Sequence, residues 1–291
     1  MRILFTISHF HDPKGSGQYG SLKPRSSARR DALARTVFSL HSTFGRRQAF
    51  LAPRTGACNA SQSADLQVVV CTTADRHLLG ELRKVPGLHY LHQPTAAEPL
   101  YLGFECHEVL KRNLGNFDYF CFLEDDIALT DPLFFQKLEW FNALAGDEAV
   151  LQPNRFETAA DQPWQKLYID GQLAQPEWSE RWQDVHDRPS IDAEAFGTPV
   201  RFVRSGNPHS GCFFLNARQM ARWAAQSDFL VRAPHFVGPL ETAATYGVMR
   251  HFRAYKPAPD NAGFLEVQHL DNRYLGVARR PARAAASTAR P

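Results

Sequence analysis

Short apolar runs alternate with segments of helical spacing through the first 130 residues. Continuous apolar runs suit buried strands, whereas apolar residues three and four positions apart suit helices. Strands are predicted at residues 2–7, 66–72, 88–91 and 118–123, and helices from Ser27 and at residues 76–84 and 104–114. This alternation predicts an α/β fold with a mostly parallel central sheet flanked by helices.

Beyond residue 144 the pattern is more irregular, with Trp-rich and Pro-rich segments between short apolar runs. Strands are predicted at residues 149–151, 166–169, 212–215, 252–255 and 265–269, and helices at residues 216–226 and from Pro239. There is no internal repeat and no linker long enough to separate two independent domains. We therefore expect one domain with two halves, residues 1–130 and 131–276.

An acidic triplet follows the most apolar of these strands. Residues 118–123 are apolar apart from the first, which is typical of a strand buried on both faces, and Glu124, Asp125 and Asp126 follow directly. Ligands of open α/β sheets bind at the carboxyl ends of strands, and adjacent buried carboxylates need a positive partner. A divalent cation meets that need. The alternative is an acidic turn that only caps the helix predicted at residues 132–144, although Asp131 can fill that role alone.

Composition and charge narrow the possible functions. Hydrophobic residues make up 44% of the chain, but no apolar run approaches the length of a membrane span, so we expect no stable membrane insertion. The five cysteines show no CxxC spacing, which favours a reduced, cytoplasmic protein. Four of the 33 basic residues lie in residues 277–291, a predicted disordered tail, which leaves 29 basic against 30 acidic residues and no case for nucleic-acid binding.

A glycine motif, Gly15-Ser16-Gly17-Gln18-Tyr19-Gly20, matches the dinucleotide fingerprint but not its context. Seven residues separate it from the preceding strand, and Pro24 intervenes before any helix. Either a mobile loop near a ligand or a plain surface loop fits better. The chain contains no GxSxG, HExxH, P-loop or EF-hand motif, so serine hydrolase, metalloprotease and nucleoside-triphosphatase functions have no support.

Glu241, His269 and an aromatic segment are further candidates. Glu241 lies in the first turn of the helix that begins at Pro239, where it is either stabilised by the helix dipole or placed as a general base. His269 ends an apolar strand and is either structural or completes a carboxylate site for manganese or zinc. The aromatic segment suits either sugar rings or packing beneath a loop, and it contains Trp164, Tyr168, Trp178 and Trp182.

The segment Leu123-Glu124-Asp125-Asp126-Ile127, followed by Asp131-Pro132-Leu133-Phe134-Phe135, resembles the acidic motif of GT-A fold nucleotide-sugar glycosyltransferases. It is similar to the EDD variant of the DxD motif found in N-acetylglucosaminyltransferases. The resemblance implies that Asp126 coordinates Mn²⁺ or Mg²⁺, which bridges the donor diphosphate, and that Glu124 and Asp125 face the ribose or support the metal. Residues 1–130 would be the nucleotide-sugar half, and residues 131–276 the metal and acceptor half.

The resemblance also implies roles for residues outside the acidic triplet. His269 would be the second metal ligand and Glu241 the catalytic base of an inverting enzyme, although retaining transfer stays open. The residues that would border the nucleoside are Thr6, Ser8, Thr72 and Thr73. Arg112, Arg155 and Asp161 are candidates for acceptor or sugar choice.

The implied reaction moves a hexosyl or N-acetylhexosaminyl group from a nucleoside-diphosphate sugar, such as a UDP-sugar, to a hydroxyl of a glycan, natural product or protein. Two alternatives stay open. One is a metal-dependent nucleotidyltransferase or sugar-nucleotide hydrolase, which needs no sugar acceptor. The other is a non-catalytic protein that binds a nucleotide sugar or a divalent metal.

Overall fold

The computed structural model describes residues 1–14, 26–51, 53–82, 87–160, 164–173, 175–232 and 235–278. The glycine motif at residues 15–20, Asp161 and most of the predicted tail lie outside these ranges. No helix in the described ranges is both long enough and apolar enough to cross a bilayer.

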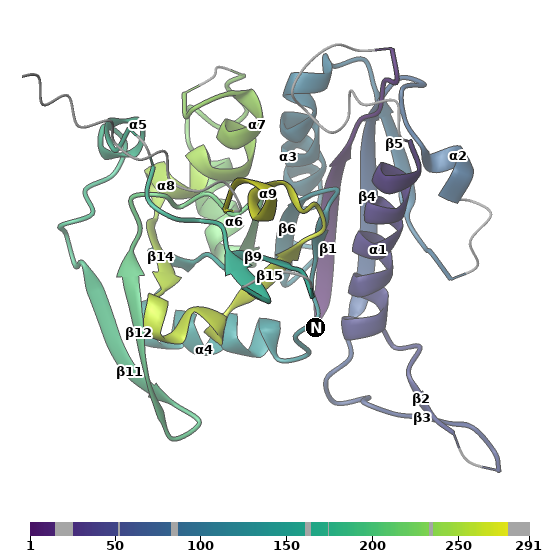
Figure 1. Ribbon diagram of the computed structural model, residues 1–291, viewed down its shortest axis with the longest axis horizontal. Coiled ribbons are helices and arrows are strands. Elements are labelled where there is room, and N and C mark those ends of the chain that lie inside the picture. The colour runs from purple at the N-terminus through teal and green to yellow at the C-terminus, as the bar shows by residue number, and fades with distance from the viewer. Residues whose placement is uncertain are drawn as a thin grey trace, which may run out of the picture.

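The central sheet has five strands in the order β13-β6-β1-β4-β5 (Figure 1). They are β1 (Arg2–His9), β4 (Asp65–Thr73), β5 (Leu91–Thr95), β6 (Tyr119–Glu124) and β13 (Cys212–Asn216). Strand β1 pairs in parallel with β4 and β6, and β4 pairs in parallel with β5, while β13 adds to β6 in the antiparallel sense. The predicted mixed α/β class with a mostly parallel central sheet is confirmed.

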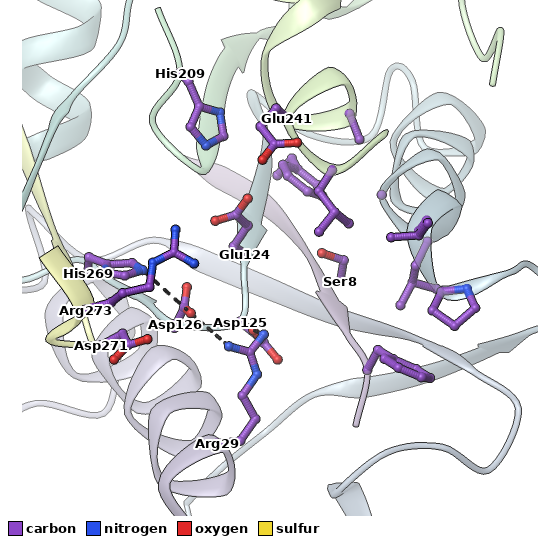
Figure 2. Close-up of a pocket in the computed structure, with 18 of the residues that line it drawn as sticks. Ser8, Arg29, Glu124, Asp125, Asp126, His209, Glu241, His269, Asp271 and Arg273 are labelled. Carbon is purple, nitrogen blue, oxygen red and sulfur yellow. Dashed lines mark hydrogen bonds and ion pairs between the residues drawn. The ribbon is translucent and has the colours of Figure 1, made fainter. Parts of the chain in front are cut away.

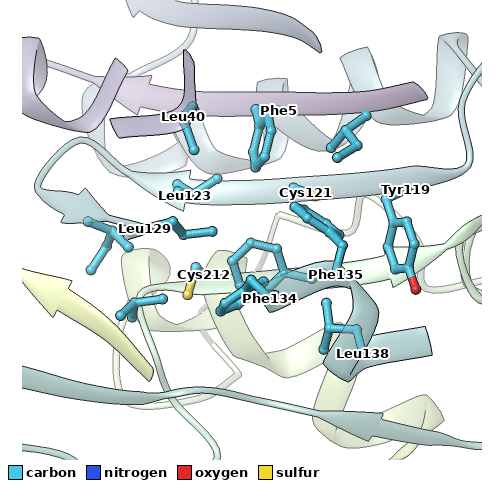
Figure 3. Packing of buried hydrophobic residues seen from close by; sticks show 14 of the residues in the cluster. Phe5, Leu40, Tyr119, Cys121, Leu123, Leu129, Phe134, Phe135, Leu138 and Cys212 are labelled. Carbon is cyan, nitrogen blue, oxygen red and sulfur yellow. The ribbon is translucent and has the colours of Figure 1, made fainter. Parts of the chain in front are cut away.

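Helices cover both faces of this sheet because successive strand residues point to opposite sides. Ile3, Phe5 and Ile7 face one layer, formed by α1 (Ser26–Phe44) and α4 (Phe134–Ala145). Figure 3 shows Phe5 and Phe135 within this layer, where their ring centroids lie 6.0 Å apart. The alternate residues, such as Leu4, face α3 (Leu102–Arg112) and α6 (Ala217–Ala224). Both faces of β1 and β6 are therefore dry, as their apolar sequences predict.

The second half of the chain builds two smaller sheets. The sheet in the order β10-β9-β15-β7 contains β7 (Ile127–Ala128), β9 (Asn154–Thr158), β10 (Lys166–Tyr168) and β15 (Glu266–His269). The sheet in the order β11-β12-β14-β8 contains β8 (Ala149–Leu151), β11 (Ser190–Ala195), β12 (Thr198–Arg204) and β14 (Arg253–Pro257). The pairing of β15 with β7 brings the end of the described chain beside the acidic turn.

The remaining elements are short. They are β2 (Ala49–Phe50), β3 (Gly56–Ala57), α2 (Leu79–Leu82), η2 (Pro99–Tyr101), α5 (Glu177–Glu180), α7 (Pro239–Glu241), η3 (Thr242–Tyr246), α8 (Gly247–His251), η4 (Pro259–Phe264) and α9 (Arg273–Ala278). The segment η3 is a π-helical turn that joins α7 to α8.

Several predicted boundaries need correction. The strand expected at residues 88–91 is instead β5, which begins at Leu91; as an edge strand it tolerates Pro94, which cannot donate to a neighbour. The helix expected at residues 76–84 begins only at Leu79 and is described as far as Leu82, while residues 83 and 84 lie outside the described ranges. Strands β7, β9, β11 and β12 were not predicted, because their polar or short sequences become strands only through pairing. Residues 277 and 278, the start of the predicted tail, belong to α9.

Gly247 allows α8 to pack directly on α6. A Cβ atom at this position would overlap the indole ring of Trp223. We predict that Gly247→Ala lowers the free energy of unfolding by about 1–3 kcal/mol, because the core must shift to admit the methyl group. Urea unfolding measures the change. Gly80→Ala is the matched control, since nothing lies within 4 Å of a Cβ there, and equal destabilisation of both variants would contradict the prediction.

Candidate active site

A cavity of about 670 Å³ opens where β1 and β6 end. The parallel register places Ser8 of β1 beside Glu124, and the chain then turns through Asp125 and Asp126 into β7. The predicted site residues that line the cavity are Ser8, Glu124, Asp125, Asp126, Glu241 and His269. Figure 2 shows Glu241 and Asp126 on opposite sides of Glu124. The structure thus brings together four segments that are far apart in the sequence.

Thr6, Thr72 and Thr73 do not line the cavity. Thr6 is fully buried one step inside the sheet, beneath α3, and its hydroxyl donates to the carbonyl of Cys121 at 3.1 Å. The Thr72 hydroxyl lies 2.8 Å from His92 Nε2. Thr73 is also buried. A position near a strand end was therefore not sufficient to reach the cavity. Of the predicted residues on β1 and β4, only Ser8, the next-to-last residue of β1, lines it.

His269 is held against Asp126 by strand pairing. It lies opposite Ile127 in the β15–β7 ladder, and the backbone N–H of Leu270 donates to the carbonyl of Asp126 at 2.8 Å. His269 Nε2 lies 3.8 Å from Asp126 Oδ2, and His269 Nδ1 lies 2.9 Å from Glu157 Oε1. In the tautomer that donates from Nδ1 to Glu157, the Nε2 lone pair is free on the side of Asp126.

Glu157 fixes both this histidine and the start of α9. Its carboxylate is fully buried and accepts the backbone N–H of Leu275 at 2.8 Å and that of Tyr274 at 3.3 Å. The sequence analysis missed Glu157 because it lies on β9, which has no strong strand signal. Asp271, Arg273 and Tyr274 also line the cavity, and their position directly after His269 was the available clue.

Arg29 and His9 contact the acidic turn. The buried Asp125 carboxylate lies 2.5 Å from His9 Nδ1 and forms an ion pair with Arg29. Arg29 also donates to Asp126 Oδ2 at 2.9 Å. Burial lowers the pKa of Arg29, but the attraction of Asp125 and Asp126 raises that pKa by more. Burial likewise raises the pKa of Asp126, and Arg29 and His269 more than offset that effect, so the net pKa of Asp126 is lowered.

Glu124 is seated against Gly211. The Glu124 N–H donates to the Gly211 carbonyl at 2.8 Å, and a Cβ atom on Gly211 would lie 2.6 Å from Glu124 Oε2. Gly211 has a φ of +61°, so this position requires glycine both for space and for backbone conformation. Burial, reinforced by the negative charge of Asp126, raises the pKa of Glu124 to about 7.

A buried ionic network reaches Glu124 through Arg155. Arg155, whose guanidinium lies 4.0 Å from the Glu124 carboxylate, donates to Asp170 at 2.8 Å. Lys256 donates to the same Asp170 carboxylate at 2.8 Å and to the carbonyl of His209 at 2.7 Å. The His209 side chain lines the cavity, and burial holds its pKa well below its usual value, so it is uncharged near neutrality.

The helix that carries Glu241 is locked in place by close packing. Thr242, the next residue, donates its hydroxyl to the Gly238 carbonyl at 2.6 Å. A Cβ atom on Gly103 of α3 would lie 2.5 Å from the Cβ of Ala243, so α3 approaches η3 closely. This contact fixes the π-helical turn that directly follows Glu241, and π-helical turns are frequent at functional sites.

The donor atoms at the acidic turn fit a hard divalent cation. Asp126 Oδ1 is buried and has no hydrogen-bond partner, and His269 Nε2 faces the same carboxylate. Within the described ranges no group of three or more His, Cys, Asp or Glu side chains forms a ready metal cage. Mg²⁺ commonly binds through one or two protein ligands together with waters and substrate phosphates, so two protein ligands at a substrate cavity are sufficient.

The aromatic segment and Arg112 lie elsewhere. Trp178 and Trp182 pack around Phe236, and Trp164 is 66% exposed. Arg112 lines a separate cavity of about 330 Å³. Among the candidates of this group that the structure describes, only Arg155 reaches the main cavity.

Comparison with solved structures gives glycosyltransferase neighbours at low identity. Mouse xyloside xylosyltransferase 1, in its apo form, is 12% identical over 86% of this chain and 82% of its own, with a TM-score of 0.40. GalNAc-T7 with UDP, GalNAc and Mn²⁺ is 10% identical over 92% of this chain, with a TM-score of 0.47, and the match covers 43% of its own chain. No family model and no curated protein sequence matches the chain.

The ionic network makes a prediction about acid stability. Burial raises the pKa of Asp170, but Arg155 and Lys256 lower it by more, to about 2. This is below the unfolded value of about 3.9, so the stabilisation is present above pH 4 and is lost as the pH falls towards about 2. We predict that Asp170→Asn lowers the free energy of unfolding at neutral pH by about 3 kcal/mol, because two buried cations lose their anion.

Urea unfolding from neutral to acid pH measures this difference. The difference in the free energy of unfolding between wild type and Asp170→Asn should become smaller below pH 4. Asp192→Asn is the control, because that carboxylate pairs with Arg201 at the surface and should contribute little. A gap that stays constant down to about pH 2 would show that Asp170 is not the titrating group.

Proposed function

We propose that the protein is a metal-dependent glycosyltransferase that moves a sugar from a nucleoside-diphosphate sugar, such as a UDP-sugar, to a hydroxyl acceptor. The observation that carries the proposal is the convergence of Asp126, His269 and Glu241 on one cavity at the carboxyl ends of parallel strands. The volume of this cavity, about 670 Å³, lies within the range of small-molecule binding sites.

The acidic turn would hold the diphosphate end of the donor. Asp126 and His269 would bind Mn²⁺ or Mg²⁺, which supplies neutralisation of the charge that develops on the leaving diphosphate. Arg29 and Arg273 line the same part of the cavity and provide fixed positive charge for phosphate oxygens. Ser8, at the end of β1, would border the nucleoside.

Glu241 would act as the general base of an inverting reaction. Its carboxylate lies across the cavity from Asp126 (Figure 2), so an acceptor hydroxyl beside Glu241 faces a sugar whose diphosphate is held at the acidic turn. The base removes the proton of that hydroxyl as its oxygen attacks the anomeric carbon, and the bond to the diphosphate breaks on the opposite side. Glu124, between the two, would bind hydroxyls of the donor. Asp125 is buried and would support Arg29.

One observation favours a non-catalytic alternative. Arg29 forms ion pairs with both Asp125 and Asp126, and so neutralises the turn without a metal. If this arrangement persists in the presence of metal and nucleotide, the acidic turn is structural. The two functions differ in metal dependence, which the next experiment measures.

We predict that a nucleotide stabilises the protein only when Mn²⁺ or Mg²⁺ is present. Thermal unfolding is measured with UDP, GDP and CMP, with and without Mn²⁺, for wild type and Asp126→Ala. At a ligand concentration of 100 times Kd the stabilisation is about 2.7 kcal/mol, which shifts the melting temperature by several degrees. The shift should vanish in Asp126→Ala when each protein is compared with its own ligand-free curve. A metal-independent shift, or none with any nucleotide, contradicts metal-dependent donor binding.

We predict that Glu241→Gln lowers turnover by about 10²–10⁴-fold, because the amide cannot accept the acceptor proton. The metal-dependent shift with the nucleotide should remain, since Glu241 does not hold the diphosphate. Glu98→Gln is the matched control, because Glu98 also lines the cavity and is assigned no proton transfer. Wild-type turnover in Glu241→Gln, measured with the donor identified by thermal unfolding, would refute the assignment.

A further inference from the structure

An arm formed by β2, β3 and their flanking residues projects from the fold. Figure 1 shows it below α1, away from the central sheet. Its two strands pair only with each other within the described fold, and every described residue from 49 to 57 is exposed. Phe50 is 73% exposed and Leu51 is 94% exposed. Two adjacent large apolar side chains at this exposure have no role in the core.

The charged residues in the sequence of the arm and its flanks are all basic. From residue 32 to residue 64 the sequence contains no aspartate or glutamate, although the whole chain carries 30. Arg46, at the base of the arm, pairs with Asp65, which lies just outside this stretch. Arg47 contacts His89, and Arg54 forms no ion pair with any residue of the described ranges. The apolar pair is therefore flanked by cations.

We propose that this β2–β3 arm binds reversibly to an anionic lipid surface. Apolar side chains enter the boundary between headgroups and acyl chains, while basic side chains are attracted to anionic headgroups. Phe50 and Leu51 supply the first interaction, and Arg47 and Arg54 supply the second. The phosphates of a nucleic acid could pair with the arginines, but a nucleic acid has no apolar surface to contact Leu51. An anionic lipid surface provides both interactions. The arm contributes no residue to the lining of the candidate active site, and the proposal is independent of glycosyl transfer.

A second projecting hairpin provides an internal comparison. Strands β11 and β12 also extend from the body (Figure 1), and Phe196 at their turn is 81% exposed. Asp192 and Glu194 lie on β11, however, and negative charge opposes contact with an anionic surface. Exposed phenylalanine is thus common to both hairpins, whereas the surrounding charge is basic in the β2–β3 arm and mixed in the other.

The test is cosedimentation of the full-length protein with lipid vesicles. We expect binding to vesicles of equal parts phosphatidylcholine and phosphatidylglycerol, little binding to phosphatidylcholine alone, and weakening by added salt. The double variant Phe50→Ser/Leu51→Ser should lower the partition coefficient by about tenfold or more. Arg54→Glu should lower it by about fivefold or more. Phe196→Ser should leave it unchanged.

Three results would overturn the proposal. The wild-type protein could fail to sediment with the mixed vesicles. The double variant could sediment as well as wild type, which would assign binding to another basic segment, such as residues 279–291. Phe196→Ser could reduce binding as much as the double variant does, which would indicate a general response to lost hydrophobicity. Because the substituted side chains are exposed, thermal unfolding curves should match wild type and exclude misfolding as the cause.

Discussion

The carboxylates at the end of β6, of which Asp125 and Asp126 are buried and Glu124 is partly buried, are the constraint on which the rest of the site depends. Strand β6 lies inside the sheet, so Glu124, Asp125 and Asp126 lose water when the sheet forms, and that loss must be compensated by charge or hydrogen bonds. The compensating groups come from elements that touch the turn, and they are His9, Arg29, Arg155 and His269. The buried Arg155 creates the same demand in turn, which Asp170 meets, and Glu157 holds His269 through its Nδ1. The ion pairs that hold the site together are thus also contacts between elements of the fold.

The parts of the fold that could be predicted are those with a strong local signal. Strands β1, β4 and β6 are continuous apolar runs, and α1 and α3 have apolar residues at helical spacing. Strand β9, by contrast, contains Arg155 and Glu157, and β12 contains a proline and two arginines. Their conformation is set by neighbours far along the chain, so local propensity cannot reveal it.

The residues of the candidate site likewise divide into those with a local sequence signal and those without one. Ser8 and the acidic triplet could be placed because the carboxyl ends of parallel strands share one edge of the sheet. Thr6 and Thr72 were assigned by the same rule, yet they lie on the covered part of their strands. Arg29 gives no local signal, since an arginine early in a helix is usually a solvated side chain. Asp170 and Lys256 likewise become notable only once the fold brings their opposite charges together in a dry environment.

The ladder between β7 and β15 has a consequence for how the protein is made. Residues 127 and 269 are paired across about half of the chain, and such non-local contacts form late because loop closure must precede them. During synthesis, a ribosome-bound chain that ends before β15 could already assemble the strands of the central sheet. It would lack the side of the cavity that His269 forms. A ligand bound against His269 could therefore stabilise the finished protein, but it could not assist the early steps of folding.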